Sequence, residues 1–120
     1  MLNPLPRVVS RHSGKEEHVV LALSPEDFCF QGHFPGNPIV PGVTQVDWAI
    51  GFAQEAFGPL GAFQGMVKLK FTDFTRPGER LELYLAYDRA KGSLTFRYQA
   101  QGIRKSAGVL LFSGEQPCKT

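Results

Sequence analysis

The chain has 120 residues, of which 42% are hydrophobic and 20% are charged, and its formal net charge is +2. This length suits one domain with one core, and so mild a charge gives no argument for nucleic-acid binding. Cys29 and Cys118 are too few for a disulfide framework, and no cysteine or histidine spacing resembles a zinc site. No stretch approaches the ~20 consecutive apolar residues that span a bilayer.

The chain shows no internal repeat and no linker. We therefore expect a single domain over residues 1–120, with a core over about residues 7–113 and a polar tail over 114–120. The first residues include Pro4 and Pro6 but no apolar run typical of a secretion signal. We expect a cytoplasmic protein.

Two strands are expected near the start of the chain. Residues 7–13 are a weak strand candidate, and residues 18–24 are a stronger one because apolar side chains alternate along them. A loop rich in proline and glycine follows over residues 31–42. With its prolines and glycines, the segment of residues 28–67 cannot be one long helix.

Residues 43–57 have the periodicity of a helix. One face carries an apolar series: Val43, Val46, Ile50, Ala53 and Phe57. Apolar side chains also cover much of the opposite side, which is typical of a buried helix. The exception is a narrow strip, about 60° wide, of Asp47, Gly51 and Gln54.

Four strands are predicted after the helix, over about residues 65–75, 80–87, 93–101 and 107–112. In the first, the alternation places Val67, Leu69 and Phe71 on one side and Lys68 and Lys70 on the other. In the third, it turns Leu94, Phe96 and Tyr98 inward. The last strand is apolar on both faces, so we expect it to be central or pressed against a partner.

The predicted architecture is α+β, with one long buried helix wrapped by a curved antiparallel sheet, which is the layout of a hotdog fold. A sheet of this size covers one side of such a helix better than all of it. We therefore expect a homodimer, or a higher even oligomer, in which two sheets and two helices share one core.

A histidine and a carboxyl group stand in the most charge-poor part of the chain, where residues 28–67 carry only the two formal charges of Asp47 and Glu55. His33 precedes Asp47 by 14 residues. A neutral imidazole is a suitable base near pH 7, and a carboxylic acid can protonate a leaving group. Gly42 leaves its backbone N–H open to a ligand carbonyl at the positive end of the helix. The set suits proton abstraction next to a carbonyl.

Residues 30–43, Phe-Gln-Gly-His-Phe-Pro-Gly-Asn-Pro-Ile-Val-Pro-Gly-Val, closely resemble the active-site loop of 3-hydroxyacyl-[acyl carrier protein] dehydratases, the FabZ/FabA-like hotdog enzymes. The downstream strands, including residues 71–79, look like the same family. The resemblance spans about residues 18–113.

The resemblance implies roles for particular residues. The family's catalytic histidine falls on His33, its catalytic acid on Asp47 and its thioester-binding amide on Gly42. Substrate contacts are expected at four positions: Phe34, Gly42, Val43 and Gly51. In the family's dimers, the histidine and the acid come from different subunits.

The implied reaction converts a 3-hydroxyacyl thioester into a trans-2-enoyl thioester. His33 would remove the α-proton, and Asp47 would protonate the departing hydroxyl. The implied partner is an acyl carrier protein, with no metal and no cofactor beyond the carrier's phosphopantetheine arm.

Three positions depart from the family's pattern. The acid is Asp47, as in the dehydratase that also isomerises, whereas the loop looks like that of the plain dehydratase with glutamate. Gly51 replaces the usual glutamine, so either Gln54 substitutes for it or Gly51 opens space for an acyl chain. The polar helix start, residues 42–48, resembles an ApeI-like stand-alone subgroup associated with aryl polyene or other specialised fatty-acid pathways.

Two other functions stay open: a hotdog thioesterase, and a weakly catalytic acyl-binding subunit that needs a second hotdog subunit. The Gly-His-Phe-Pro-Gly loop argues against the first, and the presence of both His33 and Asp47 argues against the second. Basic residues on the strands and turns are usually a solvated face. Some of them, including Lys68, Lys70 and Arg104, are alternatively a docking surface for an acidic carrier protein.

Overall fold

The computed structural model describes residues 5–14, 16–23, 40, 42–73, 75–76, 78 and 80–113. The elements within these ranges follow the predicted order: β1 (Arg7–Ser13), β2 (Glu17–Ala22), α1 (Gly42–Phe57), β3 (Phe63–Phe71), β4 (Arg80–Asp88), β5 (Ser93–Ala100) and β6 (Ile103–Phe112). The strand predicted to run to residue 75 ends at Phe71 instead. Beyond it, the backbone N–H groups of Thr72 and Asp73 both donate to the carbonyl of Lys105.

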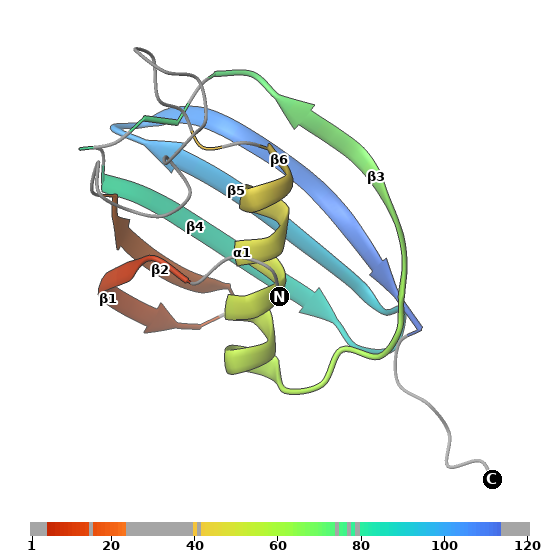
Figure 1. Ribbon diagram of the computed structural model, residues 1–120. Helices are drawn as coiled ribbons and strands as arrows, with labels where there is room; N and C mark the ends of the chain where they lie inside the picture. Colours follow the sequence, from red (N-terminus) through yellow and green to blue (C-terminus); the bar gives the residue numbers. More distant parts are fainter. Residues whose placement is uncertain are drawn as a thin grey trace, which may run out of the picture.

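The six strands form one antiparallel sheet in the order β1-β2-β4-β5-β6-β3. The sheet curves around α1, which lies across its concave face (Figure 1). This is the hotdog arrangement expected from the sequence. Strand β6 lies between β5 and β3, so the prediction of an internal last strand is confirmed.

The core lies between α1 and the inward faces of β4 and β5. The predicted alternation is confirmed, because every second residue of these strands is fully buried: Leu81, Leu83, Leu85, Leu94, Phe96 and Tyr98. Trp48 and Phe52 of α1 fill the space above them and are 1% exposed. Burial of these large side chains supplies most of the driving force that holds the helix on the sheet.

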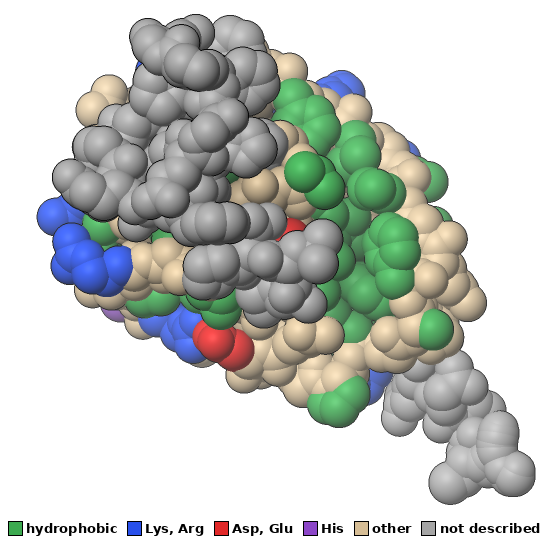
Figure 2. All heavy atoms as spheres, viewed as in Figure 1, with side chains coloured by type: hydrophobic (Ala, Val, Ile, Leu, Met, Phe, Trp, Pro, Cys, Tyr) green, Lys and Arg blue, Asp and Glu red, His purple; other side chains and the backbone are tan. Residues whose placement is uncertain are grey.

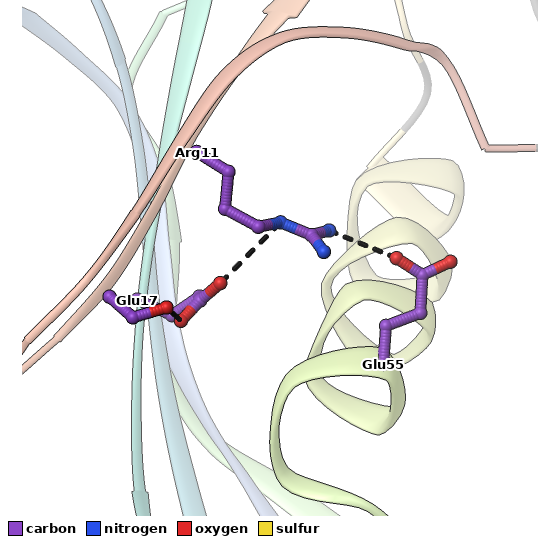
Figure 3. Close-up of polar contacts among 4 residues, drawn as sticks. Arg11, Glu17 and Glu55 are labelled. Carbon is purple, nitrogen blue, oxygen red and sulfur yellow. Dashed lines mark hydrogen bonds and ion pairs between the residues drawn. The ribbon is translucent and has the colours of Figure 1, made fainter.

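The far end of α1 is tied to the β1–β2 corner through Arg11 (Figure 3). The Arg11 guanidinium pairs with Glu55 of α1 at 2.9 Å and with Glu17 of β2 at 3.4 Å. It also lies over the ring of Phe52. In the described part of the chain, no helix combines the length and the apolar character that crossing a membrane requires.

The expected alternation along β3 is confirmed for Leu69 and Phe71 on one side and for Lys68 and Lys70 on the other, but it is wrong for Val67 because the strand contains a bulge. Val67 pairs with Val109 and Lys70 pairs with Ala107, so two residues, Lys68 and Leu69, stand opposite one residue of β6. Lys68 adopts a left-handed φ of 57° at this point. Val67 therefore does not share a face with Leu69.

On its inward side, β3 packs against Gly108 of β6. A Cβ added at Gly108 of β6 would collide with Leu69 and with Phe96, so the absence of a side chain there lets Leu69 pack onto β6. Met66 and Phe71 pair with the buried residues Leu110 and Ser106 and face the same way.

Two expectations for α1 also need correction. Val43 was expected on a buried face, but it is 72% exposed because it faces the open side of the helix near β3. The strip predicted as one polar face divides: Asp47 is half-buried, Gly51 is buried and Gln54 is exposed. Among the described residues, the sheet covers one side of the helix, and Val43 on the other side is exposed.

Candidate active site

The helix α1 begins at Gly42, directly beside the ring of Phe71 on β3. A Cβ added to Gly42 would lie 2.9 Å from Cζ of Phe71, which is closer than carbon atoms pack. The first backbone N–H groups of a helix have no acceptor within the helix and carry partial positive charge. Gly42 thus allows Phe71 to approach a helix end that is suited to bind an oxygen atom.

An apolar groove of about 210 Å³ opens between the start of α1 and β3. Its lining consists of six residues: Gly42, Val43, Val46, Met66, Leu69 and Phe71. The bulge at Lys68 and Leu69 creates the β3 side of this groove, since it turns Leu69 inward. Gly42 and Val43, two of the four positions predicted to contact substrate, therefore lie together on one apolar slot.

Asp47 lies one helical turn beyond Val43. Four residues along an α-helix rotate by about 40° relative to a full turn, so the two side chains share one side of α1. Asp47 is half-buried. Asp47 is not one of the residues that line the apolar groove, but it lies one turn along the helix from Val43, which does.

Tyr98 of β5 lies within the electrostatic reach of Asp47. Burial raises the pKa of the Tyr98 phenol well above its ordinary value, and the negative charge of Asp47 raises this pKa further. The phenol therefore stays neutral and remains a hydrogen-bond donor. Its hydroxyl donates to the backbone carbonyl of Gln45 at 2.7 Å.

Gln45 is a functional candidate that the sequence analysis did not assign to the site. It is 3% exposed in the first turn of α1, where its carboxamide bonds to Ser106 and to the carbonyl of Val40. The signal in the sequence is the polar composition of residues 42–48. The partners of Gln45 are far away in the sequence, so the network could not be foreseen.

The remaining predicted site residues divide into two groups. His33 and Phe34 lie outside the described residues. Gly51 is buried on α1, one turn beyond Asp47, and is not part of the described lining of the apolar groove. Gln54, the candidate replacement for the family's glutamine, is exposed. Among the described residues, no group of three or more His, Cys, Asp or Glu side chains is placed to hold a metal ion.

A second groove, of about 260 Å³, lies over β3, β6 and β5 and is basic. Four cationic side chains line it: Lys68, Lys70, Arg97 and Arg104. The bulge places Lys68 and Lys70 on this groove and Leu69 on the apolar one. One strand therefore borders both a basic and an apolar depression.

Comparison with known proteins places the chain in a family. Residues 9–109 match the family model of the ApeI-like proteins, described as ApeI dehydratase. A 3-hydroxyacyl-[acyl-carrier-protein] dehydratase FabZ from Thermoanaerobacter sp. (strain X514) is 34% identical over 106 residues, which cover 82% of this chain and 72% of the relative.

Solved structures agree with this result. The dehydratase heterocomplex ApeI:P from Xenorhabdus doucetiae superimposes with a TM-score of 0.82 at 34% identity, covering 88% of this chain and 96% of the other. A hypothetical thioesterase with coenzyme A from Streptococcus pneumoniae reaches a TM-score of 0.60 at 8% identity, covering 92% and 90%, and shares the fold alone. The chain belongs to the ApeI-like family of hotdog dehydratases, which is related to the 3-hydroxyacyl-[acyl-carrier-protein] dehydratases of the FabZ type.

Proposed function

We propose that this chain is a catalytic subunit that removes water from 3-hydroxyacyl thioesters and releases trans-2-enoyl thioesters. The observation that carries the proposal is the grouping of three features at the start of α1. Gly42, the helix side of the apolar groove and Asp47 all lie within the first two turns of α1. A dehydratase needs a hydrogen-bond donor for the thioester oxygen, an apolar slot for the acyl chain and an acid that protonates the departing hydroxyl.

The groove is expected to hold the carbon chain of the substrate, with the thioester carbonyl accepting a hydrogen bond from the Gly42 N–H. This bond stabilises the negative charge that develops on the carbonyl oxygen when the α-proton is removed. His33 takes that proton. The C–OH bond then breaks as Asp47 donates its proton to the departing oxygen, so the products are water and a trans-2-enoyl thioester. Return of the proton from His33 to Asp47 through solvent completes the cycle.

A second hotdog subunit is expected to complete the site along β3. Strand β3 is an edge of the sheet, and its apolar side chains are more than one third exposed: Phe63, Met66, Val67, Leu69 and Phe71. Hydrophobic side chains gather in a broad patch on the same side of the molecule as β3 (Figure 2). A long apolar edge of this kind pairs with another strand unless it is protected.

The opposite edge of the sheet has a different character. Strand β1 carries Arg7, Arg11 and His12 and only two exposed large apolar residues, Val8 and Val9, whereas β3 has five, and charged edges resist pairing. The pairing edge is therefore β3, which also borders the groove. The similar solved structure from Xenorhabdus doucetiae is a dehydratase heterocomplex. We propose that this chain likewise pairs with a second hotdog subunit, which is either another copy of the chain or a related chain.

The carrier of the acyl group is proposed to dock on the basic groove. Acidic carrier proteins are recognised by positive charge, which steers their approach and weakens with salt. Arg97 is held in place here by the ring of Tyr84, whose centroid is 4.1 Å away, and by an ion pair with Glu16 at 3.7 Å. Lys68 and Lys70 connect this surface to the strand that lines the apolar slot.

The identity of the product tests the proposed reaction. The purified protein is incubated with a 3-hydroxyacyl thioester of an acyl carrier protein, and the products are separated by mass. We expect the enoyl thioester, lost in His33→Ala and reduced by about two to four orders of magnitude in Asp47→Asn. Free acid as the main product would support a thioesterase instead.

A third result separates catalysis from simple acyl binding. If no product forms until a second hotdog subunit is added, the chain is an acyl-binding or half-site subunit rather than a self-sufficient enzyme. The glycine at position 51, in place of the family's glutamine, is the feature that favours this alternative. Circular dichroism of each variant verifies that a loss of product does not result from unfolding.

A further inference from the structure

A small polar cluster interrupts the apolar core beneath the start of α1. The inward faces of β5 and β6 are apolar along most of their length: Leu94, Phe96, Ala100, Gly108, Leu110 and Phe112. The exceptions are Tyr98 and Ser106, which are both 0% exposed and pair directly across the two strands. Two hydroxyl groups therefore point from neighbouring strands at one place on the helix.

Gln45 is the residue that meets both hydroxyl groups. The Tyr98 hydroxyl donates to its backbone carbonyl at 2.7 Å, and the Ser106 hydroxyl donates to its Oε1 at 2.6 Å. Its Nε2 donates to the carbonyl of Val40 at 3.1 Å. Through its side chain and its backbone carbonyl, Gln45 thus joins α1 to the two inner strands and to Val40, two residues before the helix.

These contacts belong to a closed ring of interactions. Lys105, the neighbour of Ser106 on β6, pairs with Asp73 at 3.2 Å although its side chain is only 5% exposed. Thr75, two residues beyond Asp73, accepts a hydrogen bond from the Val40 N–H at 2.8 Å. Gln45 in turn bonds both to the carbonyl of Val40 and to Ser106 of β6. The start of α1 and the segment that follows β3 are therefore both connected to β6.

An apolar side chain at position 45 could fill the same space without any hydrogen bond. Buried polar networks are often no more stabilising than apolar side chains of similar volume, and they are useful chiefly for the unique geometry that they specify. Here the geometry concerns the first turn of α1, with Gly42 on one side of Gln45 and Asp47 on the other. The neutral, fully buried Tyr98 keeps its donor bond to the same turn.

We infer that Gln45 is a positioning residue for the dehydration, because its bonds to Ser106 and Val40 fix where the Gly42 N–H and the Asp47 carboxyl meet the substrate. The inference rests on the proposed function of this site. Gln45 does not touch the reacting atoms. It acts through the orientation of the helix start, and a displacement of about 1 Å in such a site can reduce turnover about a hundredfold.

Two variants and their combination test this role. Gln45→Leu removes the carboxamide and leaves the Ser106 hydroxyl unpaired, whereas Ser106→Ala removes only that hydroxyl. In the double variant Gln45→Leu/Ser106→Ala, both partners are apolar, so the thermal stability lost in Gln45→Leu should largely return. The matched control is Leu94→Ala, which weakens the core at a fully buried position outside the site.

Turnover and hydrogen exchange are measured for all four variants. We expect kcat to fall at least about tenfold in Gln45→Leu, with KM nearly unchanged, and to stay low in the double variant although its stability recovers. We also expect the amides of residues 46–50 to exchange faster in both of these variants. In Leu94→Ala, kcat should follow the fraction of folded protein only.

Recovery of kcat together with stability in the double variant, or unchanged exchange at residues 46–50, overturns the inference. The exchange measurement needs no activity. If the wild-type protein forms no enoyl product, the proposed function fails on its own assay, and the exchange data alone decide whether Gln45 fixes the start of α1.

Discussion

The ring of Phe71 and the α-carbon of Gly42 lie so close together that a methyl group on Gly42 would come within 2.9 Å of Cζ of Phe71. The contact joins the first residue of α1 to the last residue of β3, and both residues line the apolar groove. Phe71 is 49% exposed, so its ring has room to move. The absence of a side chain at Gly42 therefore matters more for the shape of the groove than for the packing of the core.

Gly42→Ala should accordingly leave the free energy of unfolding within about 1 kcal/mol of wild type, because alanine favours helix and the ring can shift. Turnover should fall at least about tenfold, since the added methyl narrows the approach to the helix amide. Denaturant titration and the enoyl-product assay measure the two effects.

The double variant Gly42→Ala/Phe71→Leu separates steric relief from oxygen binding. Leucine removes the crowded ring, so a purely steric role for Gly42 predicts that activity returns. We expect activity to stay low. Full recovery would show that the glycine only makes room for Phe71.

The apolar β3 edge predicts that assembly is lost when a charge is introduced there. Val67 on β3 is 43% exposed, and Val9 on β1 is 39% exposed, so the two edges offer a matched pair. Val67→Asp should sediment as a monomer and lose activity, because a carboxylate on a pairing edge must be desolvated. Val9→Asp should keep the mass and activity of the wild-type protein.

Sedimentation velocity at several protein concentrations measures this difference. A Val67→Asp protein that keeps the assembled mass would place the subunit interface elsewhere. If Val9→Asp dissociates into monomers while Val67→Asp stays assembled, the subunit interface lies at the β1 edge instead.

The basic groove predicts a salt-sensitive KM for the carrier-bound substrate. Lys68→Glu/Lys70→Glu should raise KM about tenfold or more at low salt while kcat changes little, since charge reversal affects the approach of an acidic partner. The effect should shrink as salt is added. Lys91→Glu, in the turn between β4 and β5, is the control and should behave like wild type.

A substrate with a short uncharged thiol in place of the carrier completes this test. Its KM should be the same for the wild type and for Lys68→Glu/Lys70→Glu. An equal rise of KM for both substrates would mean that the substitutions distort β3 rather than remove a docking surface.

Tyr98 predicts a loss of stability in alkali. Its pKa in the folded protein is raised by burial and by Asp47, so the folded state retains a proton that the unfolded chain releases. The stabilisation is therefore complete below the ordinary tyrosine pKa of about 10 and is lost as the pH rises from there through the folded pKa. Denaturant titrations from about pH 8.5 to about pH 11 should show this decline.

Tyr98→Phe is the matched variant, because it keeps the ring and removes the titrating hydroxyl. It should be less stable than wild type at neutral pH by about 1 kcal/mol, the contribution of its bond to Gln45. Its stability should fall less steeply above about pH 10. If the free energy of unfolding falls equally steeply with pH in both proteins, Tyr98 is not the group responsible.

The helix and strands of this fold could be predicted from the sequence, but the order of the strands in the sheet could not. Periodicity reports which face of an element is apolar, so the helix from residue 43 and the buried faces of β4 and β5 were predicted correctly. Periodicity does not report strand order. The pairing of β3 with β6 joins segments distant in the chain, and nothing local encodes it.

The site was foreseen only in part, for similar reasons. Gly42, Val43 and Asp47 are close in sequence and share one helix, so their grouping follows from helix geometry. The bulge at Lys68 and the bond from Ser106 to Gln45 depend on tertiary packing, which can reverse the side of a strand on which a residue lies.

The most direct test of the account mixes two inactive variants, His33→Ala and Asp47→Asn, by co-expression in equal amounts. If each site takes its histidine from one subunit and its acid from the other, a mixed dimer has one intact site and one doubly impaired site. Random pairing then restores about one quarter of the wild-type turnover for a homodimer. We predict this recovery. No recovery, in mixed dimers shown to form by mass, would contradict a site shared by His33 and Asp47 across the subunit interface.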